Sequence, residues 1–224
     1  MARKLRRNSR IARTNWGLTT LIALSVFVWT SISIAATTAG NSSIRNKPGH
    51  NACVLAAQKI EAEQRLPRML LSTISLVETG KWVRETRENI AWPWTVNARG
   101  QSRYYRSKAT AIAAVRGLQS SGLRSIDVGC MQINLYYHPD AFASLEEAFD
   151  PQTNVSYAAD FLKSLRKKGR SWNTAIGYYH SRTRARYIPY QRKVQKLWRA
   201  ERRRVALERR AKQRRTASRT IVEY

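Results

Sequence analysis

The chain has few of the residues that build metal sites. Of its 224 residues, two are cysteine and three are histidine. Two cysteines cannot supply the four ligands of a structural zinc site. His50, His138 and His180 stand alone in the sequence and match no metal-ligand spacing. We therefore expect no metal and no other cofactor, and we find no internal repeat.

Acidic residues are also scarce. Only 14 Asp and Glu stand against 41 Lys and Arg, which gives a formal net charge of +27. An excess of this size indicates an anionic partner or surface. Much of it is terminal, because residues 199–219 alone carry ten basic residues. Residues 199–224 form a basic tail that is too polar to bury, and the sequence leaves open a solvated helix or a disordered tail.

No charge interrupts residues 16–36, which follow a basic head. This layout is typical of an export signal over residues 1–36, with Ser33 and Ala35 placed for cleavage. An uncleaved anchor is the alternative, since about 20 apolar residues span a bilayer. Either interpretation places the polar linker 37–50 and all that follows outside the cytoplasmic membrane, in the periplasm or cell envelope. That location, with no recognition motif present, argues against a nucleic-acid partner.

Residues 51–198 show mainly helical periodicity, so we predict one mainly α domain with a small β-hairpin insertion. The hairpin is expected within residues 90–106, whose aromatic and β-branched runs flank a turn. Ser107 is predicted to cap the helix that follows, and 124–134 is predicted to be a loop. Helices are also expected from Cys53 through Ile60, from Pro67 to Glu78, from Pro151 to Gly169, around 172–179, and from near Tyr190.

Glu78 is the clearest candidate for chemistry. It ends a nearly all-apolar helix, where burial and the negative end of the helix dipole both disfavour a carboxylate. Its pKa should therefore be raised. A carboxyl that is still protonated near neutral pH can donate a proton to a glycosidic oxygen.

Cys53 and Cys130 have two interpretations. In an oxidising compartment an even pair is more often a disulfide than two free thiols. A catalytic thiol is the alternative, but no histidine follows at a spacing that indicates a partner.

Four stretches then carry a resemblance: LLSTISLVETG, DVGCMQIN, DPQTNVSYAADFL and AIGYYHS. In this order they resemble the soluble lytic transglycosylase domain, a lysozyme-like helical fold, over roughly residues 51–198. The resemblance implies a lyase that cleaves the bond between N-acetylmuramic acid and N-acetylglucosamine in peptidoglycan and leaves 1,6-anhydro-muramyl ends.

Carried over residue by residue, the resemblance makes Glu78 the catalytic acid and base. It places Met131 and Gln132 at the floor of the glycan groove and Tyr179 near the catalytic acid. Asn134 and Tyr178 are weaker substrate-binding candidates. His180 stands where the family usually has asparagine. Cys130 replaces the usual leucine, which fits a disulfide with Cys53.

One departure from the family pattern and the available second carboxylates keep alternatives open. Glu78 and Gly129 are separated by a Trp- and Tyr-rich section that is longer than we expect for compact members of the family. This section can line the groove or be a packed structural hairpin. The alternative functions are a hydrolysing muramidase of the same fold, with Asp127, Glu85 or Glu88 as a second carboxylate, and a catalytically weak wall-binding or secretion-associated adaptor. In every case the expected partners are glycan strands and an anionic envelope surface that the basic tail contacts.

Overall fold

The computed structural model describes residues 49–222, with side chains described as far as residue 216. The predicted export or anchor segment, residues 1–36, and nearly all of the linker 37–50 lie outside the described residues. Within residues 49–222 we find no helix that is both long enough and apolar enough to cross a membrane.

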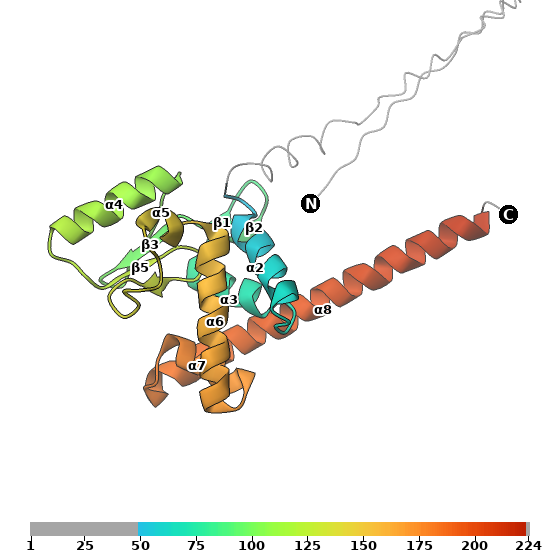
Figure 1. Ribbon diagram of the computed structural model, residues 1–224. Helices are drawn as coiled ribbons and strands as arrows, with labels where there is room; N and C mark the ends of the chain where they lie inside the picture. The colour runs from blue at the N-terminus through green and yellow to red at the C-terminus, as the bar shows by residue number, and fades with distance from the viewer. Residues whose placement is uncertain (1–48, 223–224) are drawn as a thin grey trace, which may run out of the picture. The chain divides into compact units, whose positions relative to one another are not determined.

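The described chain is mainly helical, as predicted, and contains seven helices and small antiparallel sheets (Figure 1). Five helices share the larger core. They are α2 (Ala52–Glu63), α3 (Leu70–Thr79), α6 (Pro151–Gly169), α7 (Trp172–His180) and the first part of α8 (Arg184–Val222). Leu70, Leu71, Ile74, Leu162 and Ile176 are fully buried there.

Helix α6 shows how the local sequence sets these elements. The Asp150 side chain accepts a hydrogen bond from Thr153 N, and Pro151 occupies the first turn, where its missing N–H costs nothing. Val155, Ala158, Leu162 and Leu165 then recur at helical spacing and are all buried. The predicted start, buried face and end of this helix are confirmed.

The strands form two separate sheets. β1 (Gly80–Val83) pairs with β2 (Glu88–Ala91) as one hairpin, which lies against α3. The other sheet belongs to a smaller layer of the fold. A four-stranded sheet has the order β4 (Gln101–Tyr104), β3 (Thr95–Ala98), β5 (Ile126–Val128), β6 (Ile133–Asn134). Helices α4 (Lys108–Ser120) and α5 (Leu145–Ala148) complete the layer, and Val96, Val115, Val128 and Phe149 belong to its separate core.

The predicted hairpin within 90–106 is confirmed as β3 and β4, and Ser107 caps α4 with a reciprocal pair of hydrogen bonds to Thr110. One prediction was wrong, and one element had not been predicted. The hairpin β1–β2 was missed, and residues 124–134, predicted to be a loop, contain β5 and β6. Strands of two or three residues are too short to show an alternating pattern, and β5 is held by pairing with β3, some thirty residues earlier.

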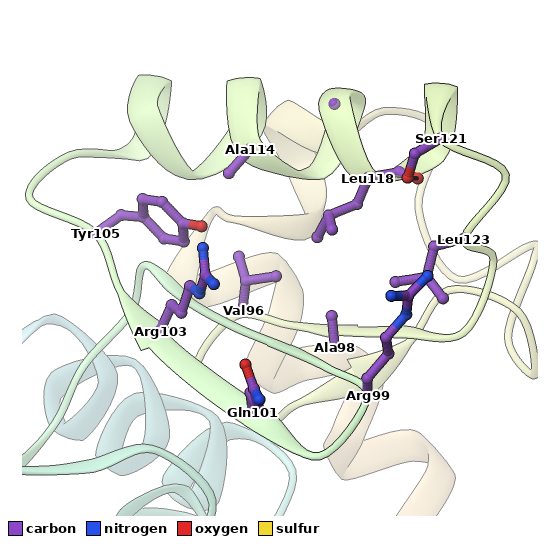
Figure 2. A pocket seen from close by; sticks show the side chains of 11 residues that line it. Val96, Ala98, Arg99, Gln101, Arg103, Tyr105, Ala114, Leu118, Ser121 and Leu123 are labelled. Carbon is purple, nitrogen blue, oxygen red and sulfur yellow. Dashed lines mark hydrogen bonds between the residues drawn. The ribbon is translucent and has the colours of Figure 1, made fainter.

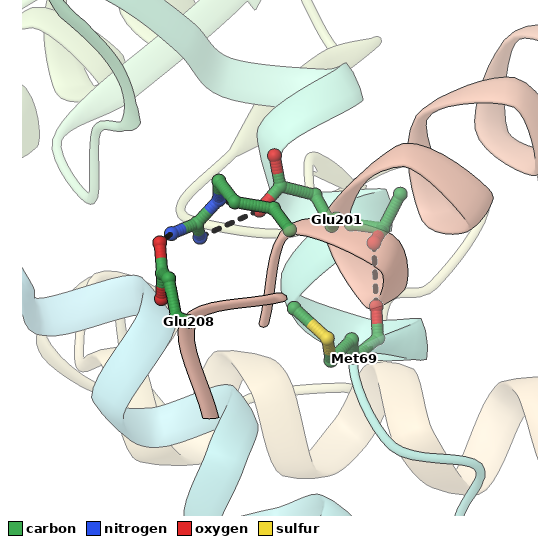
Figure 3. A network of polar contacts seen from close by, with 5 residues as sticks. Met69, Glu201 and Glu208 are labelled. Carbon is green, nitrogen blue, oxygen red and sulfur yellow. Dashed lines mark hydrogen bonds and ion pairs between the residues drawn. The ribbon is translucent and has the colours of Figure 1, made fainter. Parts of the chain in front are cut away.

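Helix α8 begins at Arg184, before the predicted start near Tyr190, and carries Pro189 within it. It also continues to Val222 without a break at residue 198, so the basic tail is helical. Arg204 donates hydrogen bonds to Glu201 (2.8 Å) and Glu208 (2.7 Å), a turn away on either side (Figure 3). Such pairs support an exposed helix by a few tenths of a kcal/mol, about 0.2–0.5 each.

The disulfide between Cys53 and Cys130 is confirmed, with both residues fully buried and their Cα atoms 5.5 Å apart. It links α2 to the turn between β5 and β6. The bond therefore fixes the segment that the sequence marked as part of the site.

Candidate active site

The helix that carries Glu78 is anchored at its start by a buried carboxylate. Glu61 accepts hydrogen bonds from Met69 N (2.6 Å), Leu71 N (2.8 Å) and Ser72 N (3.1 Å). These are N–H groups at the start of α3, which have no partner inside the helix. Burial raises the pKa of Glu61, and these hydrogen bonds lower it again. One acidic side chain on α2 therefore sets the position of α3.

Gly80 lets the chain leave α3 after Thr79, one residue beyond Glu78. A Cβ on Gly80 would lie 2.4 Å from the carbonyl oxygen of Leu76 and 2.9 Å from the side-chain nitrogen of Asn89. Any larger residue would push the end of α3 away from β1 and β2. Glu78 is thus held at a sharp change from helix to strand.

The carboxyl group of Glu78 is partly buried and accepts a 2.5 Å hydrogen bond from the Tyr190 hydroxyl. The pKa of Glu78 is raised to about 7, chiefly by burial and to a smaller extent by the nearby Asp127 carboxylate. The Tyr190 hydrogen bond and the positive charge of Lys193 act in the opposite direction. At neutral pH the group is therefore divided between its acid and its base form, which is the condition for a residue that must act as both.

The turn between β5 and β6 is clamped by Asn154, which is fully buried in α6. Its Oδ1 accepts from Met131 N at 2.8 Å, and its Nδ2 donates to the carbonyls of Val128 (3.1 Å) and Ala148 (2.9 Å). Gly129 has a φ of +79°, and a Cβ there would lie 2.4 Å from Asn154 Nδ2. The turn therefore requires glycine at 129 and an amide at 154.

Tyr179 is connected to this turn. Its hydroxyl donates to the Met131 carbonyl at 2.7 Å, and burial together with the charges of Glu78 and Asp127 raises its pKa well above the usual value. It therefore stays a neutral hydrogen-bond donor near Glu78. The Met131 side chain is fully buried in the larger core, so this residue reaches the site through its backbone.

Gln132 adopts a left-handed backbone with φ +50°. Its Nε2 donates to the carbonyls of Gly129 (3.0 Å) and Thr95 (3.2 Å), which ties the turn to β3. Its Oε1 is buried and has no partner within the described part of the chain. A buried acceptor without a partner is costly, and a ligand N–H or O–H would satisfy it.

One face of the four-stranded sheet adds polar groups to the site. Asn97 is the register partner of Asp127, and Asp127 is the partner of Asn134, so the three side chains share a face. Asn134 Nδ2 donates to Asp127 at 2.7 Å, while Asn134 Oδ1 accepts from the backbone of Tyr136 and Tyr137. Burial raises the pKa of Asp127, whereas the Asn134 hydrogen bond and the His180 charge lower it.

His180 and Tyr178 lie at the end of α7. The His180 ring stacks on Tyr190 with centroids 4.5 Å apart and planes at 6°. Burial, followed by the charge of Arg186, lowers the pKa of His180. Tyr178 contacts Tyr187 edge to face and packs against the larger core. No interaction between Tyr178 and Glu78 is found among the described residues, so Tyr178 lies beside the group rather than within it.

The structure therefore brings together Glu78, Tyr179, Tyr190, Asp127 and His180 from three helices and a strand. Tyr190 was missed as a site residue. The sequence marked it only as a position near the start of the last helix, and nothing local to it indicates that its hydroxyl meets Glu78. The disposition of α3 against α8 creates that contact.

A cavity of about 450 Å³ lies elsewhere, between α4 and the β3–β4 hairpin (Figure 2). Val96, Ala98 and Leu118 line its apolar part, and Arg99 and Arg103 project from the hairpin. Val96 alternates with Asn97 along β3, so this cavity lies on the opposite face of the sheet from Asp127. Glu78 does not line it, and we assign it no part in the site.

Substitutions of Tyr190 and Asp127 should shift the pKa of Glu78 in opposite directions. The pH dependence of any reaction that needs protonated Glu78 should shift with it. Tyr190→Phe removes a hydrogen bond that favours the carboxylate, so the pKa of Glu78 should rise and the loss of activity at alkaline pH should move to higher pH. Asp127→Asn removes a neighbouring negative charge and should move the loss to lower pH. Rate measurements across pH 5–9 check both, and shifts in the same direction would contradict the assignment.

Comparison of the chain with protein-family models, with characterised proteins and with solved structures gave no significant match.

Proposed function

We propose that the protein is an exported peptidoglycan lytic transglycosylase with Glu78 as its acid and base. The observation that carries the proposal is the placement of this one carboxyl group near the end of a buried helix, where it accepts a hydrogen bond from Tyr190 and burial raises its pKa. The four motif stretches support it, because the segments that contain them supply Glu78, the 129–132 turn, Asn154 and Tyr179.

In the proposed reaction, protonated Glu78 donates its proton to the oxygen of the glycosidic bond as that bond to C1 of N-acetylmuramic acid breaks. The acetamido group of the substrate stabilises the electron-poor C1. The Glu78 carboxylate then takes the proton from the hydroxyl on C6 of the same sugar, and that oxygen bonds to C1. Glu78 ends protonated, and no water is consumed. Because the nucleophile belongs to the substrate, the step benefits from proximity and a single carboxyl group is sufficient.

The neighbouring groups have matching roles in this proposal. Tyr190 holds the Glu78 carboxylate by its 2.5 Å hydrogen bond, which fixes the direction of proton transfer. Tyr179 remains a neutral donor, held by the Met131 carbonyl. The unpartnered Oε1 of Gln132 is an acceptor for a substrate N–H or O–H.

A hydrolysing muramidase is the second candidate, and the position of Asp127 favours it. This carboxylate is close enough to raise the pKa of Glu78 and lies on the polar face of the sheet. Hydrolysis by two carboxyl groups needs one of them to activate a water or to form a covalent intermediate. Asp127 already accepts a hydrogen bond from Asn134, which favours a structural and electrostatic role.

The products separate the two candidates. Sacculi digested by the purified protein should yield muramyl ends that are one water lighter than hydrolytic ends and that borohydride does not reduce. Mass spectrometry before and after borohydride treatment measures both properties. Mainly reducible ends would show a hydrolase, and Asp127→Asn would then be the first variant to test. No release of muropeptides by the folded protein would favour a wall-binding adaptor.

The basic part of α8 is suited to attaching such an enzyme to the peptidoglycan layer. Ten basic residues follow the last core contacts of the helix, and Glu201 and Glu208 are both paired with Arg204. We propose that this segment holds the protein on an anionic envelope surface, outside the cytoplasmic membrane. Exposed charges are screened over about 10 Å at 0.1 M salt, so the attachment should weaken as salt rises.

A further inference from the structure

A second cavity, away from Glu78, carries an unusual concentration of positive charge. It has a volume of about 400 Å³ and lies between the end of α2 and the end of α6. Lys and Arg make up 41 of the 224 residues of the chain but five of the eight that line this cavity. The five are Arg65, Lys163, Arg166, Lys167 and Arg170. The enrichment is greater than the basic composition of the chain explains.

The charge is only partly neutralised. Asp160 pairs with Lys163 at 3.1 Å, and no other carboxylate within residues 49–216 lies within ion-pair distance of the five. The ends of α2 and α6 each contribute about half a negative charge at most. Roughly three positive charges therefore remain without a counter-charge around one small cavity.

Two of the arginines are held in a backbone conformation that normally favours glycine. Arg65 has φ +53° and Arg170 has φ +57°, each just beyond the end of its helix. A side chain in this region costs conformational free energy that glycine would avoid. Here both line the same cavity, although they are over a hundred residues apart in sequence.

Two further basic side chains of the cavity are held in place by neighbouring residues. The Arg166 guanidinium lies over the Trp172 ring, 4.8 Å from its centroid. Stacking occupies the flat face of the guanidinium and leaves its N–H edge able to donate to an oxygen. Lys163 is oriented by a 3.1 Å hydrogen bond to Gln64.

We propose that this cavity, which we call the α2–α6 basic pocket, binds a phosphate-bearing group with at least two negative charges, such as a pyrophosphate or a phosphomonoester. A single carboxylate carries one charge and would leave most of the pocket uncompensated. Arginine pairs with phosphate through two parallel hydrogen bonds, and lysine adds a compact positive charge. The group can come from a soluble phosphate compound or from a phospholipid headgroup. The site is independent of Glu78 and of the proposed reaction.

The test uses the full-length protein and inorganic pyrophosphate, measured by calorimetry at constant ionic strength. The double variant Arg65→Gly and Arg170→Gly should bind at least about ten times more weakly than the unsubstituted protein, which should bind one pyrophosphate. Its melting temperature should be unchanged or higher, because glycine relieves both left-handed positions. Weaker binding therefore cannot be ascribed to unfolding.

The matched control is the double variant Arg87→Gly and Arg99→Gly. These arginines also have positive φ, both at +54°, and lie outside the pocket. The control makes the same change in net charge and in backbone freedom, and it should bind pyrophosphate as tightly as the unsubstituted protein. Equal weakening in both double variants, or no saturable binding by the unsubstituted protein, would overturn the proposal.

Vesicles that contain phosphatidylglycerol distinguish the two sources. Both double variants keep the basic part of α8, so its contribution to vesicle binding is the same in each. If the pocket variant binds the vesicles more weakly than the control, the phosphate belongs to a lipid headgroup. If the two bind the vesicles equally and only pyrophosphate binding is lost, the natural ligand is a soluble phosphate compound.

Discussion

Glu78→Gln should abolish glycan cleavage, with a decrease of roughly 10²–10⁴-fold or more in rate. Glutamine is nearly isosteric, and its carbonyl oxygen can still accept the hydrogen bond from Tyr190. It cannot donate a proton to the glycosidic oxygen or remove one from a hydroxyl. Release of soluble muropeptides from sacculi measures the effect.

Glu85→Gln is the matched control, because Glu85 is exposed in the turn between β1 and β2, seven residues from Glu78. It should keep the wild-type rate. A rate near wild type in the Glu78 variant would show that another group supplies the proton.

Glu78→Gln should also change how stability depends on pH, in the direction expected for a buried carboxyl group. In the folded protein the pKa of Glu78 is raised from 4.5 to about 7, chiefly by burial. Between these values the folded form binds more protons than the unfolded form, so stability falls as pH rises through this window. Glutamine cannot ionise. The free energy of unfolding of the variant minus that of the wild type should therefore be larger at pH 8 than at pH 4. Denaturant unfolding monitored by circular dichroism measures both values.

Loss of the disulfide should cause the largest change in stability. The bond joins residues 77 positions apart, and closing a loop of that length stabilises a fold by roughly 4–5 kcal/mol in the chain-entropy model. The double variant Cys53→Ala and Cys130→Ala should unfold at a much lower denaturant concentration. Reductant should shift the wild type toward the same midpoint and should leave the double variant unchanged.

Hydrogen bonds next to the disulfide should hold the candidate site in place when the disulfide is removed. Asn154 holds the Met131 amide, and Ser75 donates to the Cys130 carbonyl at 2.9 Å. The 129–132 turn should therefore stay in place while the protein is folded. Under conditions where the double variant is folded, glycan cleavage should remain within about an order of magnitude of the wild type. An inactive but folded double variant would mean that the disulfide positions the site directly.

Much of the helical body could be predicted from the sequence, because the information is local. The face of α6 repeats every three to four residues, and the caps at Ser107 and Asp150 are formed by side chains three residues from the N–H groups they accept. Glu78 could be singled out for the same reason. An acidic residue at the end of an apolar helix is a local pattern, and burial there does raise its pKa.

The short strands and most of the site could not be predicted in this way. β5 is held by its pairing with β3, β6 is held by its pairing with β5, and neither has enough residues to show a pattern of its own. Tyr190 meets Glu78 across 112 positions of sequence, and Asp127 acts on Glu78 from another layer of the fold. These contacts depend on how α3, α8 and the sheet pack.

The sequence by itself thus determined most of the helices and the one acid placed to be desolvated, since each depends on neighbours within a few turns of the chain. The cysteine pair could be predicted for another reason, because the chain has only two cysteines. Only the tertiary structure decided which groups set the proton affinity of that acid. It also decided that Arg65 and Arg170 line a common pocket. Hydrogen bonding and electrostatic interaction depend on distance in space, and packing brings together residues that the sequence keeps far apart.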